Sequence, residues 1–273
     1  MADKEPWSLG GGYYGDGLVF GFPSNLIYLF VKEIKIDSMK NVIIIPTYNE
    51  KNNIVLLTFN IFALMPDVSV VVVDDNSPDG TSQAVVEMQT RYPRLSLILR
   101  EKKEGLGKAY IHAFKNILAQ GSVNIIITMD ADLSHDPKYL SEMIGKTNEF
   151  DVVIGSRYVR GGGTEGWELW RKILSRWANF YCKLITRMPI HDFTAGFQVI
   201  KADSLRKIDF SKIDMSGYAF LMELKYLLWK SGAKFTEVPI VFKNRIGGES
   251  KISNHIIREG ILAPWKMRFK KRT

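Results

Sequence analysis

The stretch Val123–Pro137, VNIIITMDADLSHDP, joins a run of β-branched residues directly to two carboxylates, Asp130 and Asp132. Such a run predicts a strand that is buried on both faces. Two carboxylates one residue apart repel each other, so a cation or open water has to lie beside them. Hard cations prefer carboxylate oxygens, and Mg²⁺ is usually held by one or two carboxylates together with substrate phosphates. The stretch therefore predicts a buried strand that ends in a site for Mg²⁺ or Mn²⁺.

Similar Val- and Ile-rich runs recur along the chain and alternate with helical patterns. Unbroken apolar runs separated by helices indicate an α/β protein with a mostly parallel, Rossmann-like sheet flanked by helices. A lone Asp-x-Asp occurs in many surface turns, and its place at the end of a buried strand makes it informative. We expect strands at 41–46, 68–75, 95–100, 123–130, 151–157, 196–202 and 234–242, helices at 50–65, 81–92, 108–119, 138–147, 169–187 and 218–230, and a basic helix at the end.

The first five predicted strands all end in polar residues. Ligands of open parallel sheets bind at the carboxyl ends of the strands, so these ends are the place to look for a site. A turn rich in Gly, Asn and Ser would explain one such end, but five in succession indicate function. The five ends read PTYNE (46–50), DDNSPDG (74–80), REKKEGLGKA (100–109), DADLSH (130–135) and GSRY (155–158).

The composition narrows the classes of partner. The chain has 273 residues, of which 46% are hydrophobic and 24% charged, and its formal net charge is +8. A basic protein of this kind binds nucleic acid, anionic lipid or phosphorylated small molecules. Zinc-finger spacing, an RNA-binding aromatic motif and a basic N-terminal arm are all absent from the sequence, which argues against nucleic acid. The single cysteine, Cys182, rules out an internal disulfide and lies in an apolar helical pattern, so we expect it in the core.

The sequence suggests three segments. Residues 1–38 read as a leader that is disordered or contacts a membrane or partner, residues 39–252 as the catalytic domain, and residues 253–273 as a basic C-terminal helix and tail. The most apolar part of the leader, Leu18–Val31, is interrupted by Pro23 and is shorter than the roughly 18 apolar residues that span a bilayer. We therefore expect a protein without a membrane span.

Six motifs occur together in a familiar order: PTYNE, VVVDDNSPDGT, EGLGKAYIHAFK, MDADLSHDP, GSRYVRGGG and RIGGESK. From Val42 to Lys251 the chain resembles the large inverting family of GT-A glycosyltransferases, and within it the dolichol-phosphate mannose synthases. The resemblance implies a GT-A fold with C-terminal helices on the acceptor side. It also implies metal-dependent, inverting transfer of mannose from GDP-mannose to dolichyl (polyisoprenyl) phosphate.

The resemblance also assigns roles to individual residues, with Asp132, Arg245 and Lys251 as the catalytic set. Arg245 and Lys251 match a mobile loop that closes over the donor phosphates. Ser134 stands where some relatives have a Gln that can bind the metal, so the third protein ligand of the metal stays open. The remaining assignments are Pro46, Tyr48, Glu50, Val73 and Asp75 for the donor nucleotide, Asp130, Ala131 and Asp132 for the diphosphate and metal, and Arg157, Arg171 and Ser175 for the acceptor phosphate.

Several other interpretations compete with these roles. UDP-glucose as the donor would use nearly the same residues, and a catalytically silent scaffold that binds a partner or membrane would keep the fold. Without the resemblance, Arg171 would read as part of a solvated helix face. His135 is more typical of a structural histidine than of a metal ligand. A phosphate nucleophile is already anionic at neutral pH, so a missing general base is no objection to transfer.

The resemblance finally suggests a location and partners. The basic tail, with Lys266, Arg268, Lys270, Lys271 and Arg272, would attract an anionic leaflet by about 1 kcal/mol per charge. Some relatives continue from this point into membrane helices. We therefore expect a peripheral catalytic subunit that small hydrophobic subunits hold at the membrane. The membrane would be that of the endoplasmic reticulum, on its cytosolic face, in a eukaryote, and otherwise the plasma membrane, on its cytoplasmic face.

Overall fold

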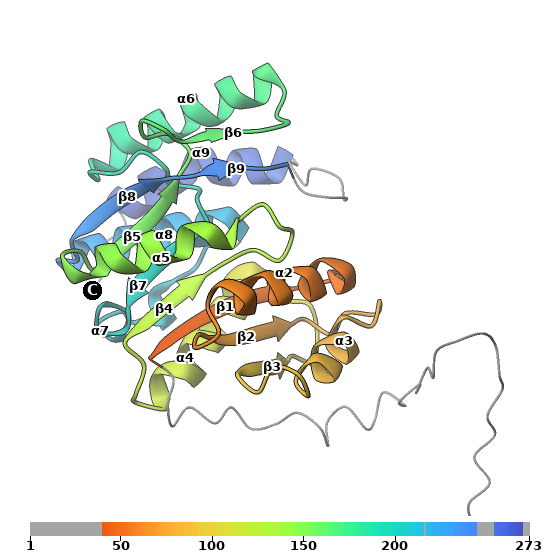
Figure 1. Ribbon diagram of the computed structural model, residues 1–273. Coiled ribbons are helices and arrows are strands. Elements are labelled where there is room, and N and C mark those ends of the chain that lie inside the picture. The colour runs from red at the N-terminus through yellow and green to blue at the C-terminus, as the bar shows by residue number, and fades with distance from the viewer. Residues whose placement is uncertain (1–39, 216, 245–253, 270–273) are drawn as a thin grey trace, which may run out of the picture.

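The computed structural model describes residues 40–215, 217–244 and 254–269 (Figure 1). Its centre is a seven-stranded sheet in the order β3-β2-β1-β4-β7-β5-β8. Neighbouring strands are parallel except β7, which is antiparallel to both β4 and β5. The predicted α/β class with a mostly parallel sheet is confirmed. The strands are β1 (Asn41–Thr47), β2 (Ser69–Asp74), β3 (Leu95–Leu99), β4 (Ile125–Thr128), β5 (Val152–Ser156), β7 (Gln198–Lys201) and β8 (Phe235–Pro239), and a small second sheet pairs β6 (Gly163–Thr164) with β9 (Val241–Phe242).

The predicted elements occur in the expected order, but the short helix Ala202–Arg206 was not expected and several elements differ in extent. The helix expected at 138–147 is only α5 (Leu140–Gly145), with a 3₁₀ turn on each side. The strand expected at 234–242 divides at Ile240, whose N–H donates to Ser156 of β5 and whose carbonyl accepts from Gly163 of β6, so β8 pairs with β5 and β9 with β6. The other helices are α2 (Lys51–Leu64), α3 (Thr81–Met88), α4 (Leu106–Ala119), α6 (Leu169–Thr186), α7 (Ala202–Arg206), α8 (Gly217–Lys230) and α9 (Asn254–Phe269).

The central strands are buried on both faces because helices cover each side of the sheet (Figure 1). Along β1, Val42 and Ile44 pack in one core with α4 and α8, while Ile43 and Ile45 pack in the other with α2. This alternation is what a strand between two helix layers requires. Cys182 is buried in the first core, as predicted, and burial raises the pKa of its thiol to about 12.

The helices α6 and α9 pack side by side at one end of the sheet (Figure 1). Their inner sides join the core, where Cys182 of α6 and Met267 of α9 are buried. Large apolar side chains also cover the outer sides of both helices. No helix within the described ranges is long and apolar enough to cross a membrane.

Candidate active site

The carboxyl ends of β1 and β2 are held together by a network of hydrogen bonds between their loops. The main-chain N–H of Asn49 donates to Ser77 Oγ at 2.9 Å, and that of Glu50 donates to Thr81 Oγ1 at 3.1 Å. Asp74 is fully buried and accepts bonds from Thr47 and Ser77 side chains. The first Asp of the DDNSPDG motif is therefore structural, and its neighbour Asp75 is left to line the sheet edge.

Asp75 has a charged partner that sequence reasoning missed. Its carboxylate accepts a 2.5 Å hydrogen bond from Nη1 of Arg100, and both side chains are 6% exposed. The other oxygen accepts the main-chain N–H of Glu104 at 3.1 Å, and Glu104 in turn contacts Arg100. Gly105 follows with a φ of 96°, which lets the chain turn from β3 into α4 beside Asp75. Arg100 ends the third predicted strand, and that position was its only signal.

The other residues expected in the donor pocket lie along the same edge. Pro46, Tyr48 and Glu50 are partly exposed, and Nζ of Lys103 lies 3.8 Å from the ring centroid of Tyr48. Val73 is fully buried in the core, so only its main chain could contribute to a ligand site.

The Asp130-Ala131-Asp132 segment follows β4 at this edge, with the side chain of Asp130 31% exposed and Ala131 buried. The main-chain N–H of Asp130 donates to Nδ1 of His135 at 2.9 Å, and Nε2 of the same ring lies 3.8 Å from Asp130 Oδ2. A nitrogen that accepts a hydrogen bond carries no proton, so the proton of the neutral ring is on Nε2, facing the carboxylate. His135 thus supports Asp130, which agrees with the structural role expected from the sequence.

The two carboxylates suit a hard divalent cation, although they provide few ligands. Among the residues that the structure describes, no group of three His, Cys, Asp or Glu side chains could hold a metal ion. Ser134 is buried, and its hydroxyl donates to Asp132 Oδ1 at 2.5 Å. Mg²⁺ commonly takes only one or two carboxylates and completes its shell with water and substrate phosphates. Asp130 and Asp132 fit that pattern.

Arg157 follows β5 and is almost completely buried. Its Nε and Nη2 form a bidentate pair with Asp192, at 2.8 and 2.6 Å, and Nη2 also donates to Thr194 Oγ1 at 2.6 Å. Burial pushes the pKa of Asp192 upward, but Arg157 beside it outweighs burial, so this pKa lies below its ordinary value. Sequence reasoning missed both partners, because they lie 35 and 37 residues away along the chain.

The structure brings the three expected acceptor residues together around two aromatic rings. The guanidinium carbons of Arg157 and Arg171 lie 5.5 and 4.1 Å from the ring centroid of Trp167. Tyr158 donates from Oη to Oγ of Ser175, four residues after Arg171 on α6. No role in binding the acceptor phosphate had been assigned to Trp167 or Tyr158. Arg245 and Lys251 lie outside the described residues.

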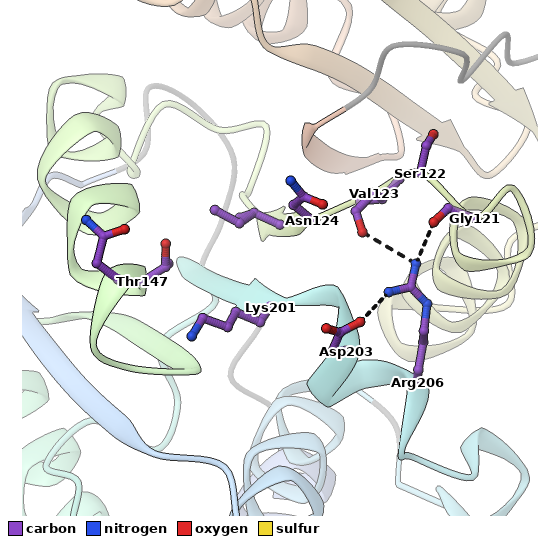
Figure 2. Close-up of a pocket in the computed structure, with 10 residues that line it drawn as sticks. Gly121, Ser122, Val123, Asn124, Thr147, Lys201, Asp203 and Arg206 are labelled. Atoms are coloured by element: carbon purple, nitrogen blue, oxygen red, sulfur yellow. Dashed lines mark hydrogen bonds and ion pairs between the residues drawn. The ribbon is translucent and has the colours of Figure 1, made fainter.

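A separate cavity of about 470 Å³ lies at the opposite ends of the central strands, where β4 begins and β7 ends (Figure 2). Its two cations are paired, since Lys201 contacts Asp151 and Arg206 contacts Asp203 and the carbonyls of Gly121 and Val123. None of the expected site residues lines it, so the candidate site lies at the carboxyl ends of the parallel strands and not in this cavity.

Comparison with known proteins settles the family. Residues 42–209 match the family described as Glycosyl transferase family 2. The chain belongs to this family. It is 39% identical to the polyprenol monophosphomannose synthase of Mycolicibacterium smegmatis, over 85% of this chain and 88% of that protein. It is 37% identical to the undecaprenyl-phosphate mannosyltransferase of Micrococcus luteus, over 82% of this chain and 92% of that protein.

Solved structures of other glycosyltransferases share the fold at low sequence identity. Glucosyl-3-phosphoglycerate synthase from Mycobacterium tuberculosis, in complex with Mn²⁺ and UDP-glucose, gives a TM-score of 0.62 at 15% identity, over 90% of this chain and 84% of that one. A mannosyltransferase from Pyrobaculum calidifontis, in complex with GDP-Man and Mn²⁺, gives 0.56 at 19% identity, over 85% and 63%. The predicted GT-A fold is confirmed.

Proposed function

We propose that this family 2 glycosyltransferase moves mannose from GDP-mannose to a polyisoprenyl phosphate such as dolichyl phosphate, with inversion at the anomeric carbon. One observation carries the proposal. Two arginines, Arg157 and Arg171, gather at Trp167 on the same sheet edge as the Asp130–Asp132 pair. Transfer between two phosphorylated substrates needs cations on both sides of the sugar. The names of the two bacterial relatives support mannose as the sugar and a polyprenyl phosphate as the acceptor.

The reaction needs alignment and charge neutralisation more than proton transfer. An oxygen of the acceptor phosphate forms a bond to the anomeric carbon of mannose, and the bond from that carbon to the diphosphate oxygen breaks. The electron pair leaves with GDP, and no proton has to be removed from the nucleophile. Arg157 and Arg171, with Ser175, orient the acceptor phosphate, and Asp132 also contacts the sugar. We keep Arg245 and Lys251 in the proposal as the cations that cover the leaving diphosphate.

A divalent ion completes the donor side. Asp130 and Asp132 would hold Mg²⁺ or Mn²⁺, which neutralises charge on the leaving diphosphate. Two similar structures contain Mn²⁺, which supports a divalent metal without choosing between the two ions for this chain. Those structures hold different nucleotide sugars, so the shared fold leaves both donors open. Asp75 and Tyr48 would receive the base, with Arg100 fixing Asp75.

We propose an anionic membrane surface as the place of transfer, because the acceptor is a lipid. The outer sides of α6 and α9 are linked by the hydrogen bond from Trp265 Nε1 to Tyr181 Oη, and Tyr181 also donates to the carbonyl of Ile261. Cations such as Lys172, Lys183 and Lys266 lie on the same two helices and suit anionic headgroups. The exposed apolar side chains, named here the apolar face, are Leu169, Trp170, Ile173, Leu174, Trp177, Phe180 and Leu184 on α6 and Ile261, Leu262, Trp265 and Phe269 on α9.

The three segments inferred from the sequence stay part of the proposal. Residues 39–252 would be the catalytic domain, and 253–273 a basic segment whose helix α9 packs on α6 and α8. Residues 1–38 lie outside the described residues. Small hydrophobic subunits would be a second means of anchoring at the apolar face. Both relatives are bacterial, which supports the plasma membrane over the endoplasmic reticulum.

A donor panel with a radiolabelled polyisoprenyl phosphate tests the function. We expect a mannolipid from GDP-mannose in the presence of Mn²⁺ or Mg²⁺, and none when a chelator is added. If product formed only from UDP-glucose, the donor would be UDP-glucose, as in the competing interpretation. No product from either donor, with wild-type protein that still binds membranes, would leave the silent scaffold as the better account.

A further inference from the structure

The segment Asp192–Gly196, DFTAG, is part of the connection between α6 and β7, has no regular structure and is nevertheless mostly buried. Buried loops are uncommon because each main-chain N–H and C=O group then needs a partner inside the protein. In this loop the partners come from several elements of the fold. The N–H of Phe193, for example, donates to Oδ1 of Asn179, on the helix that carries Arg171 and Ser175.

The two ends of the loop contact the two halves of the candidate site. On the acceptor side, Asp192 and Thr194 both bind Arg157. On the donor side, the carbonyl of Gly196 accepts a 2.6 Å hydrogen bond from Thr128 Oγ1, at the end of β4. A Cβ at position 196 would lie 3.3 Å from both Oδ1 of Asp130 and Cε1 of His135, so a larger residue would push the Asp130 carboxylate by a few tenths of an ångström. The position of the loop therefore sets the positions of Arg157 and Asp130 together.

A further contact comes from Lys225 on α8, which is fully buried. Its Nζ donates to the carbonyl of Phe193 at 2.9 Å and to that of Ala195 at 2.7 Å. These two carbonyls belong to the residues on either side of Thr194. A buried lysine is unfavourable unless the hydrogens on its Nζ have acceptors, and here two carbonyls of the loop accept them. Burial lowers the pKa of Lys225 to about 7, which agrees with a group that has given up its contact with water.

We propose that Lys225 is a positioning residue for the transfer reaction. It fixes the Asp192–Gly196 loop and so holds Arg157 and Asp130 in the correct positions relative to each other. The residue contacts neither the donor nor the acceptor, and it acts through main-chain carbonyls. The inference rests on the proposed function, because the relative position of donor and acceptor matters only if a group passes between them. A misplacement of about 1 Å in such a site lowers rates by up to roughly a hundredfold.

The test compares Lys225→Met with Lys230→Met, an exposed position on the same helix. Met keeps the length of the lysine side chain and removes its donors. We expect Lys225→Met to bind GDP with Mn²⁺ at unchanged stoichiometry, because the nucleotide contacts lie elsewhere. Its kcat per GDP-binding molecule should fall roughly tenfold or more, whereas Lys230→Met should match the wild type.

A purely structural role predicts a different result. It would lower the thermal unfolding midpoint and the number of binding-competent molecules but leave kcat per competent molecule within about threefold of wild type. That outcome would overturn the proposal. If the wild type itself transfers no mannose to any acceptor, the proposed function fails, and the role of Lys225 in transfer fails with it.

A second variant keeps the test decisive if Lys225→Met does not fold. Gly196→Ala places a methyl group against Asp130, while Gly145→Ala adds one in open space. We expect Gly196→Ala to need several-fold more Mn²⁺ for half-maximal activity, with Gly145→Ala unchanged. Equal Mn²⁺ requirements in the two variants would show that the loop does not set Asp130.

Discussion

Tyr158 donates a 2.6 Å hydrogen bond from its phenol oxygen to Oγ of Ser175, which ties the chain after β5 to the first half of α6. The bond joins the two elements that carry Arg157 and Arg171. Tyr158→Phe removes only the hydroxyl. We expect a loss of about 1 kcal/mol of unfolding free energy and a several-fold higher KM for the lipid phosphate, with the KM for GDP-mannose unchanged. Tyr92→Phe, near β3, is the matched control, and equal acceptor KM values in the two variants would contradict the assignment.

The Arg157–Asp192 pair gives a second prediction. Asp192→Asn leaves a buried guanidinium without its counter-charge, so urea unfolding near pH 7 should show a loss of about 3–5 kcal/mol. The folded-state pKa of Asp192 lies below the unfolded value of 3.8, so the ionised group stabilises the fold above that pH. The contribution is lost as the pH falls through the folded-state pKa. The gap between wild type and Asp192→Asn should therefore narrow in acid, and a gap that does not change with pH would contradict the pairing.

Asp132→Asn tests the metal assignment. The amide keeps the shape of the side chain but loses the charge that binds a hard cation. We expect at least a hundredfold lower kcat/KM and a higher Mn²⁺ requirement, measured by mannolipid formation across a Mn²⁺ titration. Asp203→Asn, with a side chain 85% exposed at the opposite ends of the central strands, serves as the control. Unchanged transfer by Asp132→Asn would remove this residue from the metal site.

The buried Lys225 predicts an unusual dependence of stability on pH. Burial is the largest cause of its lowered pKa, and Arg157 adds to it, while Asp192 and Glu237 oppose it. Between about 7 and the ordinary value of 10.5 the unfolded chain binds a proton at this site that the folded chain does not. Stability from this group therefore rises with pH over that range. From pH 7 to pH 9, urea unfolding of wild type should gain roughly 1–3 kcal/mol relative to Lys225→Met. A falling difference would place the charge on the folded lysine.

The apolar face predicts membrane binding that depends on side chains without a structural role. Ile173 and Phe180 are 60% and 65% exposed, so the double change to Ser should leave the unfolding midpoint unchanged. Binding to vesicles of phosphatidylglycerol should fall roughly tenfold or more, since burial of each side chain contributes about 1.5–3 kcal/mol. Val55→Ser with Phe59→Ser, exposed on α2, is the control. Equal vesicle binding by both double variants would favour a protein subunit as the occupant of the face.

Much of the fold could be predicted from the sequence because the patterns that mark strands are local. The Val and Ile runs of β1, β2 and β4 mark buried strands, and the polar ends that follow them lie at one edge of the sheet. The break between β8 and β9 was missed because the alternating pattern of residues 234–242 continues through Pro239 and Ile240.

The contacts within the site were harder to predict because they join residues that are far apart in the chain. Asp192 meets Arg157 across 35 residues, and no spacing rule connects the two. Lys225 and Glu223 stand inside an apolar helical run, where charged residues are themselves a signal. The partners of Lys225 are main-chain carbonyls, which a sequence pattern does not reveal.

The reversed direction of β7 has a consequence for how the site is assembled. Each parallel strand places the loop that follows it on the side of the sheet where the candidate site lies. The antiparallel β7, between β4 and β5, places there the loop that precedes it. Gly196 therefore lies between the carboxyl ends of β4 and β5, within the width of the sheet. Loop insertions elsewhere on the rim could vary the choice of substrate while this central junction stays unchanged.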